Sequence, residues 1–160
     1  MPELSNWPII YVDANPFMYA IEGNESVARP INDFFALLRE RPGIAATSEL
    51  TLAEVLPKTP APDIRRSYFN LIIWSKIFDL RPVTREILID TADYRRSTAT
   101  KQFDGRMKMV QLPDAIHIVT AIKSGCTTIL SLDAGLKVPN GVAIVAPNQD
   151  GLSLLARAIS

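Results

Sequence analysis

Residues 8–15 read Pro-Ile-Ile-Tyr-Val-Asp-Ala-Asn, a short apolar run that ends in a carboxylate. The β-branched residues between Ile9 and Val12 are typical of a buried strand in a parallel sheet, and the chain must turn directly after them. An Asp at this position loses its water unless a partner compensates for its charge. Asp13 is therefore predicted either to belong to a site at the end of the sheet or to cap the helix that starts near Pro16.

Strand and helix patterns alternate along the rest of the chain. Further strands are predicted at residues 44–47, 78–83, 128–132 and 142–145, and helices at 17–21, 31–38, 49–56, 64–76, 84–92, 114–124 and 151–159. The polar segment 97–109 is weakly patterned and is expected to be a loop or an irregular helix. This alternation predicts a single domain over residues 1–160: a three-layer α/β/α sandwich with a mainly parallel central sheet, in which ligands bind beyond the carboxyl ends of the strands.

Composition narrows the class of protein. The chain has 160 residues, enough for one domain that buries roughly 70% of its unfolded surface. Its 17 basic residues match its 17 acidic residues, so nucleic-acid binding would have to come from local patches. A single cysteine excludes an intrachain disulfide and a cysteine-based zinc site. No signal peptide or membrane-spanning run is recognisable, which favours a cytoplasmic protein without a membrane partner.

Three more carboxylates stand where elements begin or end. Glu54 lies in a short apolar helix, Asp114 opens a strongly apolar helix, and Asp133 follows the strand pattern Thr-Ile-Leu-Ser-Leu. Two of them have an ordinary alternative: a solvated helix face for Glu54, and complementation of the helix dipole for Asp114. Together with Asp13, they predict a cluster of like charges that needs a cation or retained protons. Because Mg²⁺ and Mn²⁺ prefer oxygen ligands, the pattern indicates a metal-dependent hydrolase that cuts phosphodiesters.

Neighbouring polar residues extend the candidate site. Asn15 can hold Asp13 or a water, although it can equally be a turn residue. Ser131 is expected to point to the same side as Asp133 if residues 131–133 are extended. His117 follows Asp114 at helical spacing, which suits a metal pair, but a lone His on an apolar helix is more often a hydrogen-bonded core residue.

Basic residues are densest in one stretch of the chain. They are Arg85, Arg95, Arg96, Lys101, Arg106 and Lys108. The last five are expected to contact a nucleic-acid substrate, and the alternative is an ordinary solvated helix face.

Four short motifs carry a family resemblance. They read Ile-Tyr-Val-Asp-Ala-Asn, Ser-Glu-Leu-Thr-Leu-Ala-Glu-Val, Leu-Pro-Asp-Ala-Ile-His-Ile-Val-Thr-Ala and Leu-Ser-Leu-Asp-Ala-Gly-Leu, in this order. The chain resembles the PIN-domain ribonucleases from its first strand to Val145, and within them the VapC-type toxins of bacterial and archaeal toxin–antitoxin pairs. The resemblance maps the family's acidic quartet onto Asp13, Glu54, Asp114 and Asp133, and its accessory polar residues onto Asn15 and Ser131. The chain departs from the family in its N-terminal extension and in the long, basic segment between Thr98 and Leu112.

The resemblance implies a function and partners. It implies a ribonuclease in which the quartet is catalytic and binds Mg²⁺ or Mn²⁺, with RNA as the substrate. It also implies a homodimer and a cognate antitoxin, which would place an Arg or Lys among the carboxylates and cover apolar surface near Phe17, Trp74 and Trp7. A catalytically silent PIN-like module that binds RNA or protein is the alternative. A receiver-like phosphoacceptor domain lacks the acidic pair it would need, and a dinucleotide-binding enzyme lacks its glycine motif.

Overall fold

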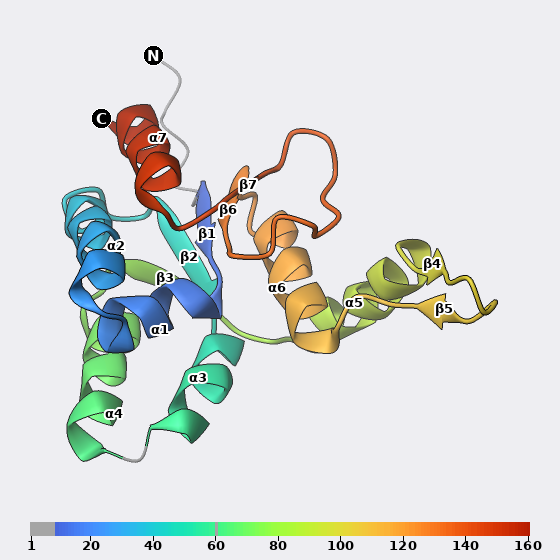
Figure 1. Ribbon diagram of the computed structural model, residues 1–160, viewed down its shortest axis with the longest axis horizontal. Coiled ribbons are helices and arrows are strands. Elements are labelled where there is room, and N and C mark those ends of the chain that lie inside the picture. The colour runs from blue at the N-terminus through green and yellow to red at the C-terminus, as the bar shows by residue number, and fades with distance from the viewer. Residues whose placement is uncertain (1–8, 60) are drawn as a thin grey trace.

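The computed structural model describes residues 9–59 and 61–160. Its main sheet has five parallel strands in the order β3-β2-β1-β6-β7, and a separate two-stranded ribbon pairs β4 with β5 (Figure 1). The elements are β1 (Ile10–Val12), α1 (Ala14–Glu22), α2 (Glu25–Arg39), β2 (Ala45–Ser48), α3 (Leu50–Val55), the 3₁₀ helix η1 (Leu56–Lys58), α4 (Pro62–Phe69), the π-helix η2 (Asn70–Trp74), β3 (Phe78–Arg81), α5 (Arg85–Ser97), β4 (Thr100–Lys101), β5 (Met107–Lys108), α6 (Leu112–Lys123), β6 (Thr128–Leu130), β7 (Ala143–Val145) and α7 (Gln149–Ile159).

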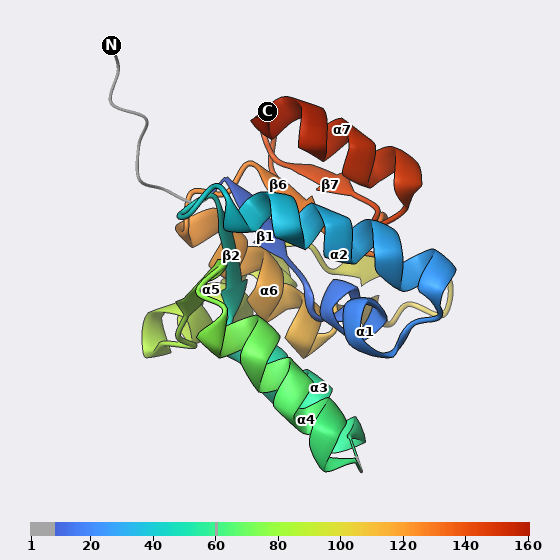
Figure 2. The same ribbon diagram turned by 90° about the vertical axis from the view of Figure 1, so that its left-hand side faces the viewer.

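Helices cover both faces of the sheet, as the predicted three-layer sandwich requires. On one face Ile10 and Val12 pack in a large core with side chains of α1, α2 and α7 (Figure 2). On the other face Tyr11 packs with Ile118 of α6. Because side chains alternate along a strand, β1 sends Ile10 and Val12 to one layer and Tyr11 to the other. The residue that follows, Asp13, thus starts on the side where α6 lies.

The carboxyl ends of three neighbouring strands meet at one edge of the sheet. Val12 of β1 is in register with Leu130 of β6, so Asp13 and Ser131 follow paired residues. The backbone N–H of Asp13 donates to the carbonyl of Leu130 at 3.1 Å, which holds the two strand ends together. β2 lies on the other side of β1 and leads directly into α3. This topology brings side chains from opposite ends of the sequence to the same edge.

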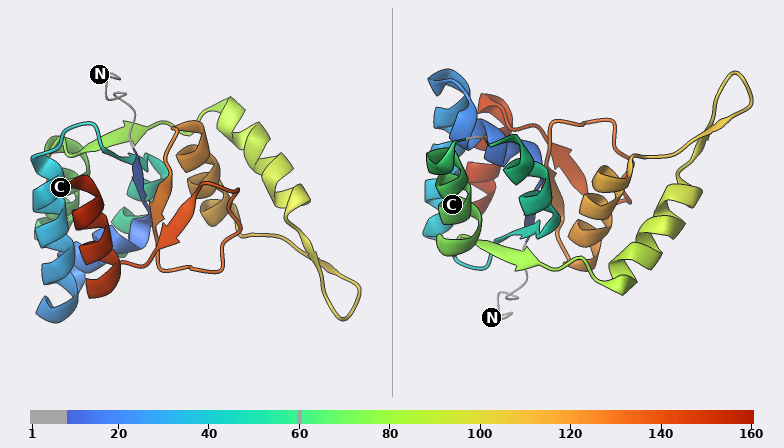
Figure 3. Two further views of the ribbon diagram at one scale, coloured as in Figure 1. Left: turned by 90° about the horizontal axis from the view of Figure 1, so that it is seen from above. Right: turned by 90° about the horizontal axis from the view of Figure 1, so that it is seen from below.

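The prediction for residues 97–109 was wrong. This segment forms an antiparallel hairpin, the β4–β5 arm (residues 100–108), which projects from the body next to α5 (Figure 3). The turn at its tip is local chemistry: Asp104 accepts a hydrogen bond from the backbone N–H of Arg106, and Gly105 has φ of 83°, a conformation that favours glycine. Two-residue strands offer too short an alternation to be read as strands from sequence.

The structure also bears on the predicted helix at 64–76, the predicted cap at Ser48 and the end of β6. The helix predicted at 64–76 begins at Pro62 and passes into η2, while Ser48 accepts a hydrogen bond from the backbone N–H of Leu50 at 3.0 Å near the start of α3. The chain bends at Leu132 after β6 ends, so residues 131–133 are not extended and the condition for Ser131 and Asp133 to point to the same side is not met. No helix in the described ranges is long and apolar enough to cross a lipid bilayer.

Candidate active site

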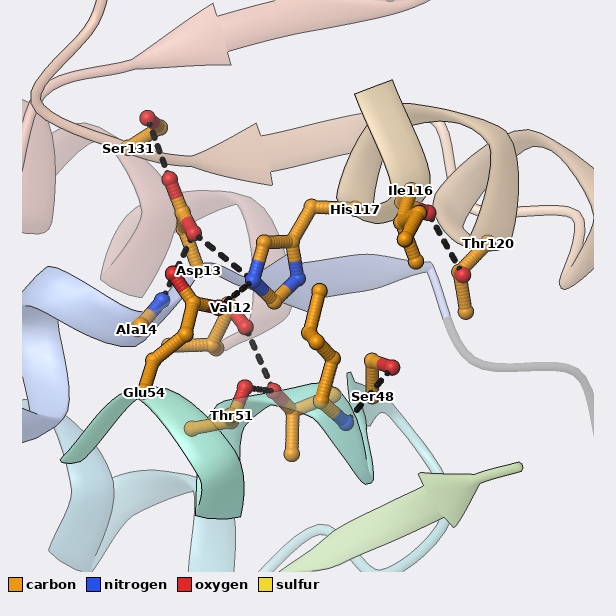
Figure 4. Close-up of polar contacts among 12 residues, drawn as sticks. Val12, Asp13, Ala14, Ser48, Thr51, Glu54, Ile116, His117, Thr120 and Ser131 are labelled. Carbon is orange, nitrogen blue, oxygen red and sulfur yellow. Dashed lines mark hydrogen bonds and ion pairs between the residues drawn. The ribbon is translucent and has the colours of Figure 1, made fainter. Parts of the chain in front are cut away.

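Asp13 stands at the junction of β1 and α1 and is almost fully buried, at 7% exposure. Its Oδ1 accepts a hydrogen bond from the backbone N–H of Ala14 at 2.7 Å, so the expected capping role is real. Its Oδ2 accepts a hydrogen bond from the Ser131 hydroxyl at 2.9 Å (Figure 4). The two bonds hold both carboxylate oxygens in place, and a carboxylate oxygen with one donor keeps a lone pair for a second partner.

His117 connects the buried core with the carboxylates. Its Nδ1 is 2.6 Å from the hydroxyl of Tyr11, which is fully buried. On the other side of the ring, Nε2 is hydrogen-bonded to Oε1 of Glu54 and lies 3.4 Å from Oδ1 of Asp13. His117 is thus a hydrogen-bonded core residue, the more common role for such a His, and it also orients Glu54 (Figure 4).

The protonation of His117 follows from these neighbours. Burial lowers the pKa of His117, but the hydrogen bond to Glu54 and the charges of Asp13 and Glu54 outweigh burial and raise the pKa above its usual value. Burial also raises the pKa of Tyr11 well above its usual value, and the charge of Asp13 raises it further, so Tyr11 keeps its proton. A carboxylate can only accept, so Nε2 donates to Glu54. The ring therefore donates a hydrogen bond to a negatively charged site, which favours its protonated form.

Two buried threonines position the helix that carries Glu54. The Thr47 hydroxyl donates to the carbonyl of Val12 at 2.7 Å and is 2.9 Å from the Thr51 hydroxyl. Both residues are fully buried. They join the end of β1 to the first turn of α3, so Glu54, one turn further along α3, faces the same edge of the sheet as Asp13.

Asp114 lies in the first turn of α6, one turn before His117, and is half-buried. Burial raises its pKa, and the carboxylates of Asp13, Asp133 and Glu54 raise it further, whereas His117 lowers it. These carboxylates therefore interact as one electrostatic cluster. Asp133 is exposed, and its Oδ1 accepts a hydrogen bond from the backbone N–H of Gly135 at 3.0 Å.

Asp114 and Asp133 line the same cavity, which has a volume of about 400 Å³. Its other walls come from the base of the arm, the start of α6 and the loop after Asp133. They are Thr98, Thr100, Lys108, Met109, Val110, Gln111, Gly135, Leu136 and Lys137. The cavity therefore gives a substrate access to the acidic cluster from the side of the arm.

The donor set fits a hard divalent cation in its chemistry. Its members are carboxylates, which Mg²⁺ and Mn²⁺ prefer, and burial together with repulsion by Asp13 and Asp133 raises the pKa of Asp114, as expected for carboxylates held close together. Within residues 9–59 and 61–160, no three His, Cys, Asp or Glu side chains are spaced to hold a metal ion as they stand. Glu54, in particular, is turned to His117. The fit is one of ligand type and charge.

The remaining predicted residues have different surroundings. Asn15 lies in the first turn of α1 and is half-buried. Of the five basic residues expected to contact substrate, Lys108 lines the cavity beside Asp114 and Asp133. Arg95 donates through Nε to the carbonyl of Val110 at 2.8 Å, and Arg96 pairs with Asp93 at 3.6 Å.

The apolar surface expected around Phe17 is absent, because Phe17 is fully buried between Phe35 and Phe78. Its place on the hydrophobic face of α1 explains this. Trp74 is 62% exposed and stacks on Phe69, with ring centroids 5.8 Å apart. Trp7 lies outside the described residues.

The sequence did not reveal the buried residues that hold the acidic cluster in place through hydrogen bonds. Tyr11, Thr47 and Thr51 belong to apolar segments, where they look like ordinary core and strand residues. Alternation along β1 was an available signal for Tyr11, because it places Tyr11 on the same face as Asp13. Nothing in the spacing of Thr47 and Thr51 points to the carbonyl of Val12, which is 35 residues from Thr47.

Comparison with known proteins agrees with this geometry. The family model of the PIN domain matches residues 10–141. The chain therefore belongs to the PIN domain family, as its four motifs predicted. Members of the PIN domain family, including the VapC proteins, are typically nucleases. No curated protein matches the chain in sequence.

Solved structures share the fold at low sequence identity. The VapC20 toxin of Mycobacterium tuberculosis, which cleaves the sarcin–ricin loop, is 16% identical, with a TM-score of 0.59 over 79% of this chain and 91% of that chain. A chain of the VapBC2 complex of Rickettsia felis, bound to a promoter DNA fragment, is 15% identical, with a TM-score of 0.62 over 86% of this chain and 98% of that chain. A chain of the FitAB complex bound to DNA is 16% identical, with a TM-score of 0.60 over 87% of this chain and 95% of that chain. At this identity the likeness concerns the fold.

Proposed function

We propose that this protein is an endoribonuclease that hydrolyses RNA phosphodiesters with Mg²⁺ or Mn²⁺. The observation that carries the proposal is the cluster of carboxylates at the carboxyl edge of the sheet, where burial and then repulsion by the neighbouring carboxylates raise the pKa of the half-buried Asp114. Membership of the PIN domain family, whose VapC-like members are typically nucleases, supports it.

The carboxylates of Asp13, Glu54, Asp114 and Asp133 are the proposed ligands and catalytic groups. When bound there, the metal ion would lower the pKa of a water and neutralise charge on the phosphate. Ser131 and the N–H of Ala14 fix the two oxygens of Asp13, while His117 and Tyr11 fix Glu54. Asn15 is proposed to orient the water or Asp13 from the first turn of α1. Such supporting contacts restrict the rotation of the ligands and tune their basicity.

Each carboxylate has a different place in the proposed reaction. Asp13 is buried and doubly hydrogen-bonded, which suits a fixed ligand. Asp114 and Asp133 face the cavity, where a scissile phosphate would enter. Glu54 accepts a hydrogen bond from Nε2 of His117, which holds its carboxylate in place, so it is suited to accept the proton of the attacking water.

Basic side chains are proposed to hold the substrate. The sequence offers five candidates, Arg95, Arg96, Lys101, Arg106 and Lys108. Arg95 already donates to the carbonyl of Val110, Arg96 pairs with Asp93, and Lys101 lies on the face of the hairpin opposite to Lys108, so Arg106 and Lys108 are the proposed contacts. Lys108 is placed to contact the phosphate backbone, because it lines the cavity together with Asp114 and Asp133. RNA as the substrate makes the cytoplasm the proposed site of action.

A role as the toxin of a toxin–antitoxin pair is part of the proposal. The similar folds include the VapC20 toxin and chains of the VapBC2 and FitAB complexes. An antitoxin is proposed to place an Arg or Lys among the carboxylates, where it would compensate their charge. The exposed Trp74, stacked on Phe69, offers apolar surface to such a partner. A homodimer is proposed on the same family grounds.

A catalytically silent binding module is the competing function. It would keep the fold and the basic surface but would not cleave RNA with any divalent ion. Purified protein incubated with labelled RNA in Mg²⁺, in Mn²⁺ and after removal of metal by a chelator separates the two. We expect cleavage only with metal, and loss of cleavage in Asp13→Ala. Undiminished cleavage after rigorous metal removal would refute the proposed mechanism.

The toxin role has its own test. Expression of the chain alone in a bacterial host should arrest growth, and Asp13→Ala should abolish the arrest. Asp150→Asn is the matched control, because Asp150 is an exposed acidic residue of α7 on the opposite layer. If the wild-type chain is harmless while the purified protein still cleaves RNA, the toxin role fails and the nuclease proposal stands.

A further inference from the structure

The β4–β5 arm carries an aromatic side chain far from the hydrophobic core. Phe103, near its tip, is fully exposed, and Met107 is 56% exposed. The arm extends away from the sheet beyond the end of α5 (Figure 3). A protruding hairpin that buries none of its large apolar side chains gains little stability from them, so its sequence requires another explanation.

The two faces of the arm differ in their chemistry. Thr100 is paired directly with Lys108, and Lys101 with Met107. Directly opposed residues of an antiparallel pair share one face, and adjacent residues point to opposite faces. Thr100 and Lys108 therefore lie on one face, and Lys101 and Met107 on the other.

The face with Lys108 continues along the arm. The side chain of Gln102 donates to the Thr100 hydroxyl at 3.3 Å, which places it on this face. The backbone N–H of Gln102 donates to the carbonyl of Arg106, so Arg106 is opposite Gln102. This first face, the polar face (Thr100, Gln102, Arg106 and Lys108), presents two cations two residues apart, about 7 Å along the strand.

The polar face is joined to the acidic cluster. Thr100 and Lys108 both line the cavity of about 400 Å³ that Asp114 and Asp133 also line. Lys137, from the loop after Asp133, adds a cation to the same wall. A polymer whose backbone is negatively charged can therefore lie on Lys108 and Lys137 while one of its phosphates reaches Asp114.

Helix α5 holds both walls of the cavity in position. Arg95 donates through Nε to the carbonyl of Val110 at the base of the arm, at 2.8 Å. Tyr94 donates through its hydroxyl to the carbonyl of Lys137 at 2.7 Å, and Lys137 donates through Nζ to the carbonyl of Thr98 at 3.1 Å. These bonds fix the arm and the loop against the same helix, so the cavity is a built feature of the fold.

We propose that the polar face of the arm and the cavity at its base bind single-stranded RNA, with Arg106, Lys108 and Lys137 on successive phosphates and Phe103 stacked on a base. The inference rests on the proposed ribonuclease function and assigns its substrate a path and a class. Cations that track a backbone, together with an exposed aromatic ring, are the usual means of binding single strands without sequence preference. Lys101, on the opposite face, takes no part, and Arg95 acts by fixing the arm.

The charge balance favours nucleic acid over a second copy of the chain. The arm has three basic residues, Lys101, Arg106 and Lys108, against the single acidic residue Asp104, although the chain as a whole is neutral. Two arms brought together would repel each other. The one ion pair of the arm, Arg106 with Asp104 at 3.8 Å, is exposed and therefore weak, so Arg106 can exchange it for a phosphate.

The test uses the full chain and a fluorescein-labelled single-stranded RNA, with fluorescence anisotropy recorded in a chelator at several salt concentrations. Lys108→Gln should weaken binding and reduce the slope of log K against log salt by about 0.7, the value for one lost contact to a single strand. Lys101→Gln removes the same charge from the other face of the same arm and should leave both quantities unchanged. Phe103→Ala should weaken binding about fivefold or more, with little change in the salt slope.

Defined results would overturn the inference. Equal losses of RNA affinity in Lys108→Gln and Lys101→Gln would show a general electrostatic attraction to the arm and not a path along one face. Absence of RNA binding by the wild type would refute the proposed path. If RNA affinity is unchanged in every arm variant and Phe103→Ala converts a dimer to a monomer in light scattering, the arm is an interface between two copies. Cleavage of the same RNA in Mn²⁺ is measured separately. If binding depends on Lys108 but no cleavage occurs, the proposed nuclease function is refuted while RNA binding by the arm is supported.

Discussion

Replacement of Tyr11 by Phe removes one oxygen atom from the centre of the protein and tests the support of the site. The Tyr11 side chain is fully buried, and its hydroxyl lies 2.6 Å from Nδ1 of His117. Phe has the same ring and fills the same space, so packing against Ile118 is kept. The substitution therefore isolates a single buried hydrogen bond.

The expected magnitude follows from the group that is left behind. Without the hydroxyl, Nδ1 of His117 remains buried with no partner, and an unsatisfied buried polar atom costs about 1–3 kcal/mol. For a protein of this length, 1 kcal/mol shifts the melting temperature by roughly 2–4 °C, so a loss of about 2 kcal/mol lowers it by roughly 4–8 °C. Because His117 then orients Glu54 less firmly, Mn²⁺ affinity should fall roughly 10- to 100-fold, as when other supporting contacts of metal ligands are lost.

Chemical denaturation and titration calorimetry with Mn²⁺ measure the two effects. Tyr94→Phe is the matched control, because its hydroxyl donates to the carbonyl of Lys137 at the surface, where water can replace it. We expect the control to lose less than about 1 kcal/mol. The proposed role of the Tyr11 hydroxyl is contradicted if Tyr11→Phe is as stable as the wild type, or if it is destabilised and yet binds Mn²⁺ with unchanged affinity.

Four further predictions concern charge, metal and a buried thiol. Asp114→Asn should abolish cleavage yet stabilise the metal-free protein at neutral pH, and this gain in stability should disappear as pH falls through the raised pKa of Asp114. The control Asp150→Asn, also in the first turn of a helix, should change neither cleavage nor stability. A loss of stability in Asp114→Asn would favour a capping role for Asp114. Mn²⁺ at ~100 times its dissociation constant should add about 2.7 kcal/mol, or roughly 5–10 °C in melting temperature, and less at acidic pH; an insensitive melting temperature counts against the site. His117 is the only histidine, so an NMR titration of the metal-free protein follows its ring alone; its pKa should lie above the usual value and fall in Glu54→Gln. The contribution of protonated His117 to the free energy of unfolding is full below the pKa of the unfolded state and is lost as pH rises through the pKa of the folded state. Burial raises the pKa of Cys126 to about 12, so iodoacetamide should modify it only on unfolding, and rapid alkylation of the native protein, detected by mass spectrometry, would contradict this.

The sequence alone determined the architecture of the sheet and the helices around it. The apolar run from Ile9 to Val12, the stop at Gly23 and the apolar helix that opens at Asp114 are local signals, because hydrophobic periodicity and turn residues act within a few positions. The order of strands and helices then implied a parallel sheet, and the position of Asp13 directly after a strand implied its place at the carboxyl edge. The motifs also led to the PIN domain family.

Local signals were insufficient where an element is short or its partner is distant. The β4–β5 arm has two residues in each strand, and the bend at Leu132 ends β6 earlier than its apolar pattern suggests. The apolar character of Phe17 did not reveal whether it lies in the core or on an interface. Burial depends on which helices pack on it, and that is a property of the whole fold.

The tertiary structure alone decided how the site is supported. Tyr11 and His117 are 106 positions apart, and His117 and Glu54 are 63 apart, so no spacing rule could pair them. Parallel pairing of β1 with β2 and β6 brings these segments together, and alternation along β1 turns Tyr11 toward α6. The separate pairing of β4 with β5 sets Lys108 and Lys101, identical in type and seven residues apart, on opposite faces of one hairpin. Sequence determines which residue types are available, whereas the distances that allow a hydrogen bond or a shared cavity exist only once the chain has folded.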